Sequence, residues 1–424
     1  MKLPCLLCVF SGLLAAQSAP DPAATARKAL DLLIGGKYAD LFQMFTPDLQ
    51  TAIPQESLSK LADTQLKTRG AVESIGEPSV RKAGQNSVVL IPVKLASQNV
   101  NFQAAINPTG QLYIMNLLPG DVNWQRPPYS KPDSFRERQV TVGQGEWQLP
   151  GTITSPVGAG PFPAVVLVHG DGPNDRDETV GGTKVFKDLA EGLASRGIVV
   201  LRYEKRSKQY AGKMVGRNNI TVKEEAIDDA LAAVGLLRTQ KEVDPQRIYV
   251  LGHSRGGYVA PRIAEQDGKL AGLIIFAGNA RPLEDVILEQ AQSTKITPQQ
   301  LDAMKKMVAR VKALEPEDVD APPILGMPAA YLLDLKGYDP AALAKKLGIP
   351  VLVLQGERDF QVSMTDFNLW KSTLGGGKNV AYHSYPALNH LFVAGEGKST
   401  EAEYRNPGHV APEVINDIAT WIAH

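Results

Sequence analysis

Residues 247–257 read RIYVLGHSRGG, an apolar run that stops at Gly252 and continues through Ser254 to a second glycine, Gly256. The pattern G-x-S-x-G is typical of a sharp strand-to-helix turn that exposes a strained serine at its apex. Glycine is needed at both ends because strand and helix come too close there for a side chain. Ser254 is therefore a candidate nucleophile. The pentapeptide alone is also compatible with an ordinary strand-to-helix connection that has no catalytic role. The surrounding sequence is therefore needed to distinguish the two interpretations.

Continuous apolar runs on both sides of this stretch predict a parallel sheet. They lie at residues 164–168, 198–201, 248–251, 273–276 and 351–354, and helical stretches separate them. Unbroken runs of Val, Ile and Leu are expected for strands buried on both faces. An alternating pair at 138–142 and 146–153 precedes them as two antiparallel strands. The chain is thus predicted to form a doubly wound α/β fold, whose ligands bind beyond the carboxyl ends of the strands.

Two loops after predicted strands offer the partners that a serine nucleophile needs. Asp359 follows the run at 351–354, within QGERDFQV, and His390 lies in the loop PALNHLF at 386–392. The order Ser254, Asp359, His390 is one of the known chain orders of a catalytic triad. The competing carboxylates are Glu357 and Asp366, and the competing histidines are His383, His409 and His424.

The stretch HGDGP at 169–173 follows the first apolar run and predicts an oxyanion loop. A glycine-rich turn can present backbone N–H groups to a developing negative charge, and we assign the Asp171 and Arg255 N–H groups to this role. His169 is expected to hold the loop together. The Asp171 carboxylate would oppose an oxyanion unless it turns away or pairs with Arg176 or Arg255, and we expect it to turn away.

Five motifs together resemble the α/β-hydrolase superfamily. They are HGDGPNDRDE at 169–178, FKDLAEGLASRGIVVLRYEKR at 186–206, GHSRGG at 252–257, QGERDFQV at 355–362 and NHLF at 389–392. Over roughly residues 135–424 the chain is most similar to exported bacterial carboxylesterases of the dienelactone-hydrolase and prolyl-oligopeptidase-like branches. The resemblance implies a Ser254–Asp359–His390 triad that hydrolyses short-chain acyl esters through an acyl-enzyme. A peptidase or amidase, an acyl thioesterase and a non-catalytic binding protein remain alternatives.

The alternation of predicted strands and helices is interrupted between about residues 280 and 345 by a mostly helical segment. Its apolar stripe consists of Leu301, Met304, Val308, Val311 and Leu314. An insertion here is expected to cover the elbow as a lid and to shape the acyl pocket. Methionine there would tolerate varied acyl groups.

The first 18 residues predict a secretory signal peptide. Lys2 precedes an apolar stretch of about 14 residues, too short to span a bilayer, and Ala16–Ser18 forms a small-x-small cleavage pattern. We therefore expect export to the periplasm or the medium. Both cysteines, Cys5 and Cys8, lie in this segment, so the mature chain would have neither disulfides nor thiol chemistry.

Residues 19–120 predict a separate small α+β domain. Helical spacing over 23–40 and 54–68 gives way to alternating runs at 72–80, 87–95, 100–106 and 111–117. The element order weakly resembles domains of the nuclear-transport-factor or cystatin kind. We expect a structural or self-associating role for it, and a semi-rigid, proline-rich linker at 121–134 leading to the catalytic domain at 135–424.

The composition gives no sign of a charge-driven partner. The chain of 424 residues has 45 basic and 45 acidic residues and no long basic block, which disfavours nucleic-acid binding. It lacks the HExxH pattern, and its Gly375–Lys378 stretch does not match a phosphate-binding loop. We therefore expect no cofactor, no metal and no membrane span, with a small-molecule ester as the substrate.

Overall fold

The structure is a computed structural model that describes residues 20–67, 70–96, 99–120, 124–214, 217–294 and 296–424. The chain divides into two compact units, with the boundary between Asn123 and Trp124. The predicted signal peptide at residues 1–18 lies outside the described residues. Within the described ranges, no helix has both the length and the apolar character needed to cross a membrane.

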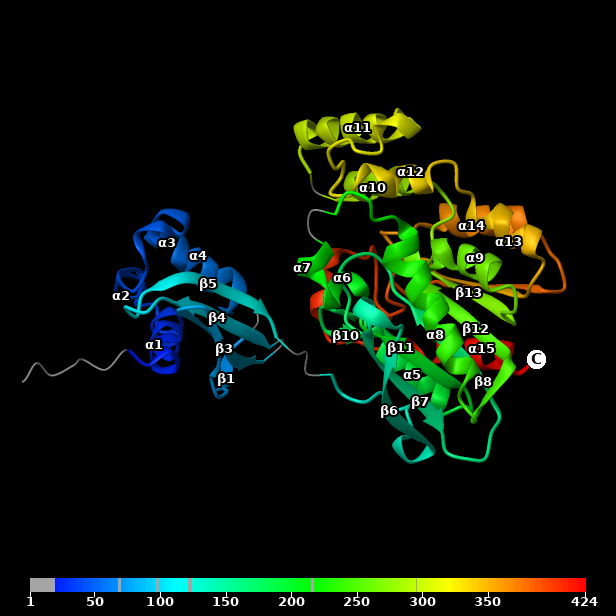
Figure 1. The fold of residues 1–424 in the computed structure, drawn as a ribbon, viewed down its shortest axis with the longest axis horizontal. Coiled ribbons are helices and arrows are strands. Elements are labelled where there is room, and N and C mark those ends of the chain that lie inside the picture. The colour runs from blue at the N-terminus through cyan, green and yellow to red at the C-terminus, as the bar shows by residue number, and fades with distance from the viewer. Residues whose placement is uncertain (1–19, 68–69, 97–98, 121–123, 215–216, 295) are drawn as a thin grey trace, which may run out of the picture. The chain divides into compact units, whose positions relative to one another are not determined.

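The first unit packs four helices against an antiparallel sheet (Figure 1). The sheet order is β1-β3-β4-β5, and β2 also pairs with β3. The helix predicted over 23–40 is interrupted at Gly35 and Gly36, where Gly36 has a φ of 71°. The strand predicted over 72–80 is two strands. The elements are α1 (Pro22–Ile34), α2 (Tyr38–Gln43), α3 (Pro47–Ala52), α4 (Gln55–Gln65), β1 (Val72–Ile75), β2 (Ser79–Ala83), β3 (Asn86–Leu95), β4 (Val100–Ile106) and β5 (Leu112–Pro119).

The second unit is built on an eight-stranded sheet of order β15-β14-β13-β12-β8-β11-β7-β6. Strand β7 pairs antiparallel with both β6 and β11, and the remaining pairs are parallel. The α/β prediction is confirmed. The strands are β6 (Phe135–Val142), β7 (Leu149–Pro156), β8 (Phe162–Val168), β11 (Val199–Tyr203), β12 (Val243–His253), β13 (Gly272–Phe276), β14 (Val351–Gly356) and β15 (Val380–Tyr385).

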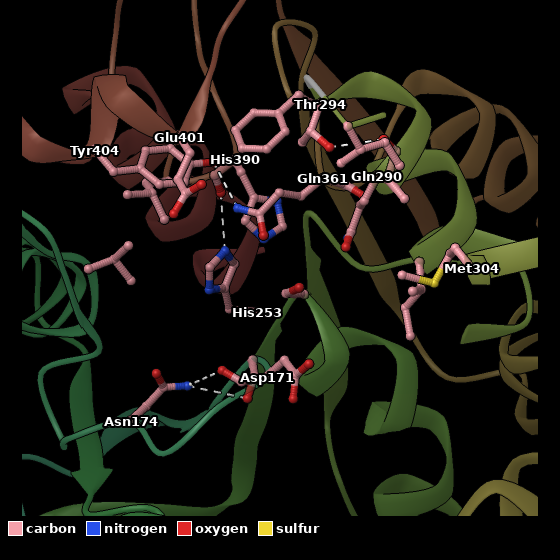
Figure 2. Close-up of a pocket in the computed structure, with 18 of the residues that line it drawn as sticks. Asp171, Asn174, His253, Gln290, Thr294, Met304, Gln361, His390, Glu401 and Tyr404 are labelled. Carbon is pink, nitrogen blue, oxygen red and sulfur yellow. Dashed lines mark hydrogen bonds between the residues drawn. The ribbon is translucent and has the colours of Figure 1, made fainter. Parts of the chain in front are cut away.

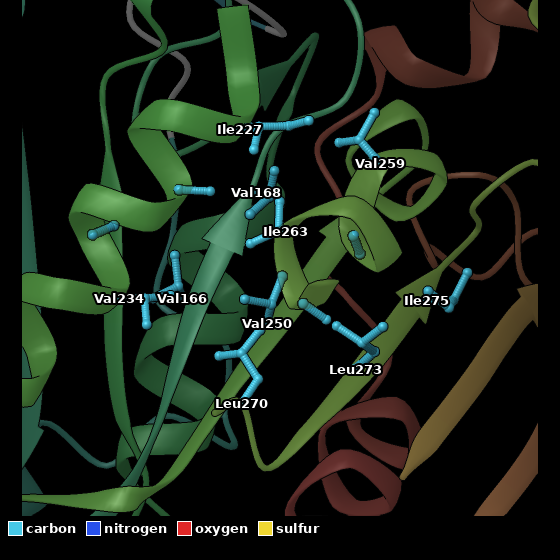
Figure 3. Close-up of a cluster of buried hydrophobic side chains, with 14 of the residues drawn as sticks. Val166, Val168, Ile227, Val234, Val250, Val259, Ile263, Leu270, Leu273 and Ile275 are labelled. Atoms are coloured by element: carbon cyan, nitrogen blue, oxygen red, sulfur yellow. The ribbon is translucent and has the colours of Figure 1, made fainter. Parts of the chain in front are cut away.

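Helices cover both faces of this sheet, so its central strands are buried on both sides. In β8, Val166 and Val168 face one core, whereas Val165 and Leu167 face the other. Figure 3 shows the first core, where Val166, Val168 and Val250 lie near the helix that carries Ile263. That face is covered by α8 (Asp228–Arg238), α9 (Arg255–Asp267), α13 (Pro340–Leu347) and α14 (Met364–Leu374), and the opposite face by α5 (Val185–Ala194) and α15 (Pro412–Ala423).

The proline-rich stretch after Asn123 packs on the second unit instead of forming a free linker. The Trp124 indole N–H donates to Asp188 at 2.7 Å. Arg126 Nε and Ser130 Oγ both donate to Glu191 Oε2, each at 2.6 Å. Asp188 and Glu191 are buried on α5. Residues 124–130 are therefore part of the second unit, which corrects this part of the linker predicted at 121–134.

The helical insertion is shorter than the predicted 280–345. Helices α10 (Leu283–Ser293), α11 (Pro298–Lys312) and α12 (Ala329–Leu335) form it, and α13 packs against α9 and α14 as part of the helix layer. Val311 and Leu314 of the predicted stripe belong to a small core within the insertion, and Val308 is also buried. Four short elements complete the unit: β9 (Thr179–Val180), β10 (Thr183–Lys184), α6 (Arg206–Gln209) and α7 (Ala211–Met214).

Candidate active site

Ser254 stands at the apex of a strained turn between β12 and α9. Its φ of 53° lies in the left-handed region that non-glycine residues rarely adopt, and its N–H donates to the Phe276 carbonyl at 2.9 Å. A Cβ at Gly256 would overlap the Val168 carbonyl oxygen, and one at Gly252 would overlap the backbone of Gly256. The two glycines are therefore required by close packing of the turn, as the elbow pattern predicts.

The structure brings Asp359 and His390 together in a buried pair. Asp359 follows β14 and His390 follows β15, and His390 Nδ1 lies 2.6 Å from Asp359 Oδ2. Asp359 Oδ1 accepts the N–H groups of Gln361 and Val362 at 2.7 and 2.9 Å. These bonds fix the carboxylate, which in turn orients the imidazole and leaves its Nε2 on the other side of the ring.

None of the competing residues is arranged in this way. Asp366 is buried against Arg281, 2.6 Å from its guanidinium, and Glu357 accepts from the Ser384 hydroxyl at 2.8 Å on the surface. His383 lies 3.3 Å from Asp417, and His409 lies 3.2 Å from Asp188. His424 is the last residue, after α15.

The loop after β8 carries the predicted oxyanion donors close to the elbow. His169 Nε2 lies 2.6 Å from the Tyr203 carbonyl of β11, which ties the loop down as expected. The Gly170 carbonyl accepts from the Lys205 ammonium at 2.8 Å. The Asp171 N–H and the Arg255 N–H, which opens α9, have no acceptor among the described residues. Both are therefore available to an oxygen atom of a bound substrate.

The Asp171 carboxylate is paired with the side chain of Arg255. Its Oδ2 lies 2.8 Å from Arg255 Nη2, and its Oδ1 accepts the Gly172 N–H at 2.7 Å. Burial alone would lower the pKa of Arg255, but Tyr331, Asp171 and Glu225 together raise it, so the guanidinium remains charged. Arg176, the other partner considered, binds Glu204 instead. The negative charge beside the predicted oxyanion donors is thus paired with a positive one.

This pairing makes Asp171→Ser a mild substitution. We expect kcat/KM for a p-nitrophenyl ester to change by less than about tenfold, because the Asp171 charge is already compensated and its N–H remains. Asp171→Asn, which keeps the size and removes the charge, is the matched control. An increase of tenfold or more in either variant would show that the carboxylate opposes catalysis.

Ser254 and His390 open onto one large cavity of about 820 Å³ (Figure 2). Helices α10 and α11 form one wall of it, so this part of the insertion covers the elbow. The wall residues are Ile287, Gln290 and Ala291 of α10, Gln300, Ala303, Met304 and Met307 of α11, and Thr294 and Ile296 between the two helices. No Lys or Arg is among the described residues that line the cavity. Within the described chain, no three His, Asp or Glu side chains converge as a metal site would require.

Two buried residues beside Ser254 were missed by the sequence reasoning. Glu178 and His253 lie 2.8 Å apart through Oε2 and Nδ1, and both line the cavity. Each stands within a quoted motif, but neither motif indicates that the two side chains meet across 75 residues of chain. Lys205 and its neighbours Arg202 and Arg206 are buried and form ion pairs with Glu225, Glu137 and Asp229, respectively.

The chain is similar to several known proteins. The dienelactone hydrolase family matches residues 149–305. Esterase EstD of Thermotoga maritima is 45% identical over 308 residues, which cover 70% of each chain. The uncharacterized peptidase YtmA of Bacillus subtilis is 28% identical over 49% of this chain and 70% of its own. Est1E of Butyrivibrio proteoclasticus has 16% identity and a TM-score of 0.46, with 68% of this chain and 99% of Est1E covered.

The EstD match is decisive because it combines high identity with coverage of 70% of both proteins. The chain therefore belongs to the α/β-hydrolase superfamily and, within it, to the esterase family of EstD.

Proposed function

We propose that the chain is a serine carboxylesterase that hydrolyses short-chain acyl esters through a Ser254–His390–Asp359 triad. The observation that carries the proposal is that Ser254, strained at the elbow, faces the same cavity as a histidine whose Nδ1 is bound to a buried carboxylate. This arrangement supplies a nucleophile, a base and the group that orients the base.

The reaction follows from these positions. His390 Nε2 takes the hydroxyl proton as Ser254 Oγ attacks the ester carbonyl, and the Asp171 and Arg255 N–H groups bind the resulting oxyanion. His390 then gives the proton to the leaving alcohol, so that the C–O bond breaks and an acyl-serine remains. Water enters, loses a proton to His390 and attacks the acyl carbon. The acid leaves, and Ser254 recovers its proton.

The cavity favours an uncharged acyl group. Its wall on α10 and α11 is largely apolar, and no Lys or Arg lines it among the described residues, whereas Asp171, Glu178 and Glu401 contribute carboxylates. A substrate with its own carboxylate would find no lysine or arginine partner there. Neutral acyl esters fit this surface better.

A panel of substrates tests the proposal. The parent protein is assayed on p-nitrophenyl acetate, butyrate and octanoate, on an acyl thioester and on an aminoacyl-nitroanilide. We expect turnover of the esters, and labelling of Ser254 by a fluorophosphonate. Preference for the nitroanilide or the thioester would favour the peptidase or thioesterase alternative. A folded protein with neither turnover nor labelling would contradict every serine-hydrolase assignment.

The wall on α11 is expected to set the acyl length. Met304→Trp should lower kcat/KM for octanoate at least about tenfold relative to acetate, since filling a pocket by a few methylene groups discriminates at this level. The matched control is Lys305→Trp, on the exposed side of the same helix. Equal effects of Met304→Trp on acetate and octanoate would show that this wall does not contact the acyl chain.

Two further proposals concern the protein outside this site. We propose export, with cleavage after Ser18, and self-association through the first unit. N-terminal sequencing of the mature protein and sedimentation of the full chain with and without residues 19–120 test them.

A further inference from the structure

The buried pair of Glu178 and His253 lies beside the proposed triad but has no part in the reaction written above. The side chains of Glu178 and His253 are almost fully buried. His253 directly precedes Ser254, and its ring lies 4.7 Å from that of His390, measured between ring centroids. Figure 2 shows the two histidines one above the other at the cavity. A buried charged pair at this place requires an explanation.

The contacts of the pair determine where its protons lie. His253 Nε2 lies 3.1 Å from the His390 carbonyl oxygen, which can only accept, so Nε2 must carry a hydrogen. Nδ1 faces Glu178 Oε2 at 2.8 Å, and Glu178 Oε1 accepts the Gly170 N–H at 2.7 Å. All four side-chain polar atoms are satisfied. His253 Nε2 is therefore occupied and cannot serve Ser254 as a base, which leaves that role to His390.

The charged form of the pair is the favoured one. Burial alone would raise the pKa of Glu178, but the charge and hydrogen bonds of His253 and its neighbours lower it. Burial alone would lower the pKa of His253, but Glu178 and the His390 carbonyl raise it. Both shifts favour the form of the pair in which Glu178 is a carboxylate and His253 an imidazolium.

The pair joins the two loops on which the reaction depends. Through Gly170 it binds the loop whose next residue, Asp171, presents a proposed oxyanion donor. Through the His390 carbonyl it binds the residue proposed as base. Glu178 has a φ of 47°, and Phe392, two residues after His390, has a φ of 56°. Strained backbone of this kind persists only where surrounding contacts hold it.

We propose that Glu178 and His253 are a positioning pair, which holds the Asp171 N–H and the His390 imidazole at the separation that the tetrahedral intermediate requires. This inference rests on the proposed esterase function. It predicts that loss of the pair lowers kcat and leaves KM almost unchanged, because the contacts it fixes matter most in the transition state.

Three variants test the inference. Glu178→Leu leaves the Gly170 N–H unpaired, and His253→Phe leaves the His390 carbonyl and the Glu178 carboxylate unpaired. We expect each to lower kcat about a hundredfold, with KM within about threefold, as for loss of one oxyanion donor or a misplacement of about 1 Å. Glu178→Gln can accept from Gly170 and donate to a neutral His253, so it should retain kcat within about fivefold.

Two controls separate positioning from general loss of stability. Asp267→Asn breaks a partly buried ion pair with Arg238 at the far end of α9, and it should lower Tm without lowering kcat. The double variant Glu178→Leu/His253→Phe should be no slower than either single variant, because the residues act as one unit. If Glu178→Leu does not fold, His253→Gln replaces it and should lower kcat at least about tenfold.

The outcomes distinguish this inference from the proposed function. An active parent whose Glu178→Leu and His253→Phe variants keep kcat within threefold would overturn the positioning role. The positioning role would also be overturned if kcat of Glu178→Gln were as low as kcat of Glu178→Leu. In that case the hydrogen bonds of residue 178 would not determine kcat. A parent without turnover and without fluorophosphonate labelling would instead refute the esterase proposal itself.

Discussion

Replacing Ser254 with alanine is expected to lower kcat for p-nitrophenyl butyrate by about 10⁵- to 10⁶-fold, as loss of the nucleophile does in other serine hydrolases. Alanine retains the Cβ and removes only the hydroxyl, so no atom remains that can form the acyl-enzyme. The turn itself should survive, because Gly252 and Gly256 still permit the close approach of β12 and α9. The measurement is a single-turnover assay together with mass analysis after fluorophosphonate treatment.

Ser372→Ala is the matched control for this experiment. Ser372 is an exposed residue of α14 whose hydroxyl donates to the Leu369 carbonyl at 3.0 Å, outside the cavity. It should leave both kcat and labelling unchanged. If Ser254→Ala retained more than about 1% of the parent's kcat, or if labelling persisted at another residue, the nucleophile would lie elsewhere in the chain.

Local chemistry explains why much of this site is visible in sequence. Each of four features can be recognised from a few consecutive residues, because their pattern is that of a strand, a turn or a loop. These features are the elbow, the apolar strands, Asp359 and His390. The interruption of the first helix at Gly35 and Gly36 could also be found locally, because glycine at positive φ ends helices. Fold class and the candidate triad were therefore predictable, although the ends of several elements were not.

Other features depend on contacts between distant parts of the chain. Asp171 and Arg255 are 84 residues apart, and Glu178 and His253 are 75 residues apart. The sequence shows that such charged residues need partners, but it does not show which partner each residue binds.

The structure of residues 124–130 was predicted wrongly for a related reason. Its prolines indicate a linker, whereas its Trp, Arg and Ser side chains bind two carboxylates that α5 supplies from about 60 residues away.

Replacing Asp359 with asparagine should lower kcat about 10⁴-fold, as the equivalent change does in a serine protease. The two backbone N–H groups at Asp359 Oδ1 require an acceptor, so the amide oxygen must take that position. The amide NH₂ then faces His390 Nδ1 and the Gln355 amide, which itself donates to Oδ2 at 3.0 Å. Nδ1 can satisfy the new donor only by giving up its hydrogen. His390 would then carry its proton on Nε2 and could not accept one from Ser254.

Asp366 provides an unusually close control for this variant. Its side chain is also fully buried and accepts two backbone N–H groups, from Ala280 and Arg281 at 2.9 and 3.0 Å, and it pairs with the Arg281 guanidinium instead of a histidine. Asp366→Asn should therefore lose a similar share of stability, seen as a lower Tm, while kcat stays within about tenfold of the parent. If both variants lost activity equally, the loss would reflect a weakened fold. Only a drop confined to Asp359→Asn identifies the carboxylate that sets the tautomer of His390.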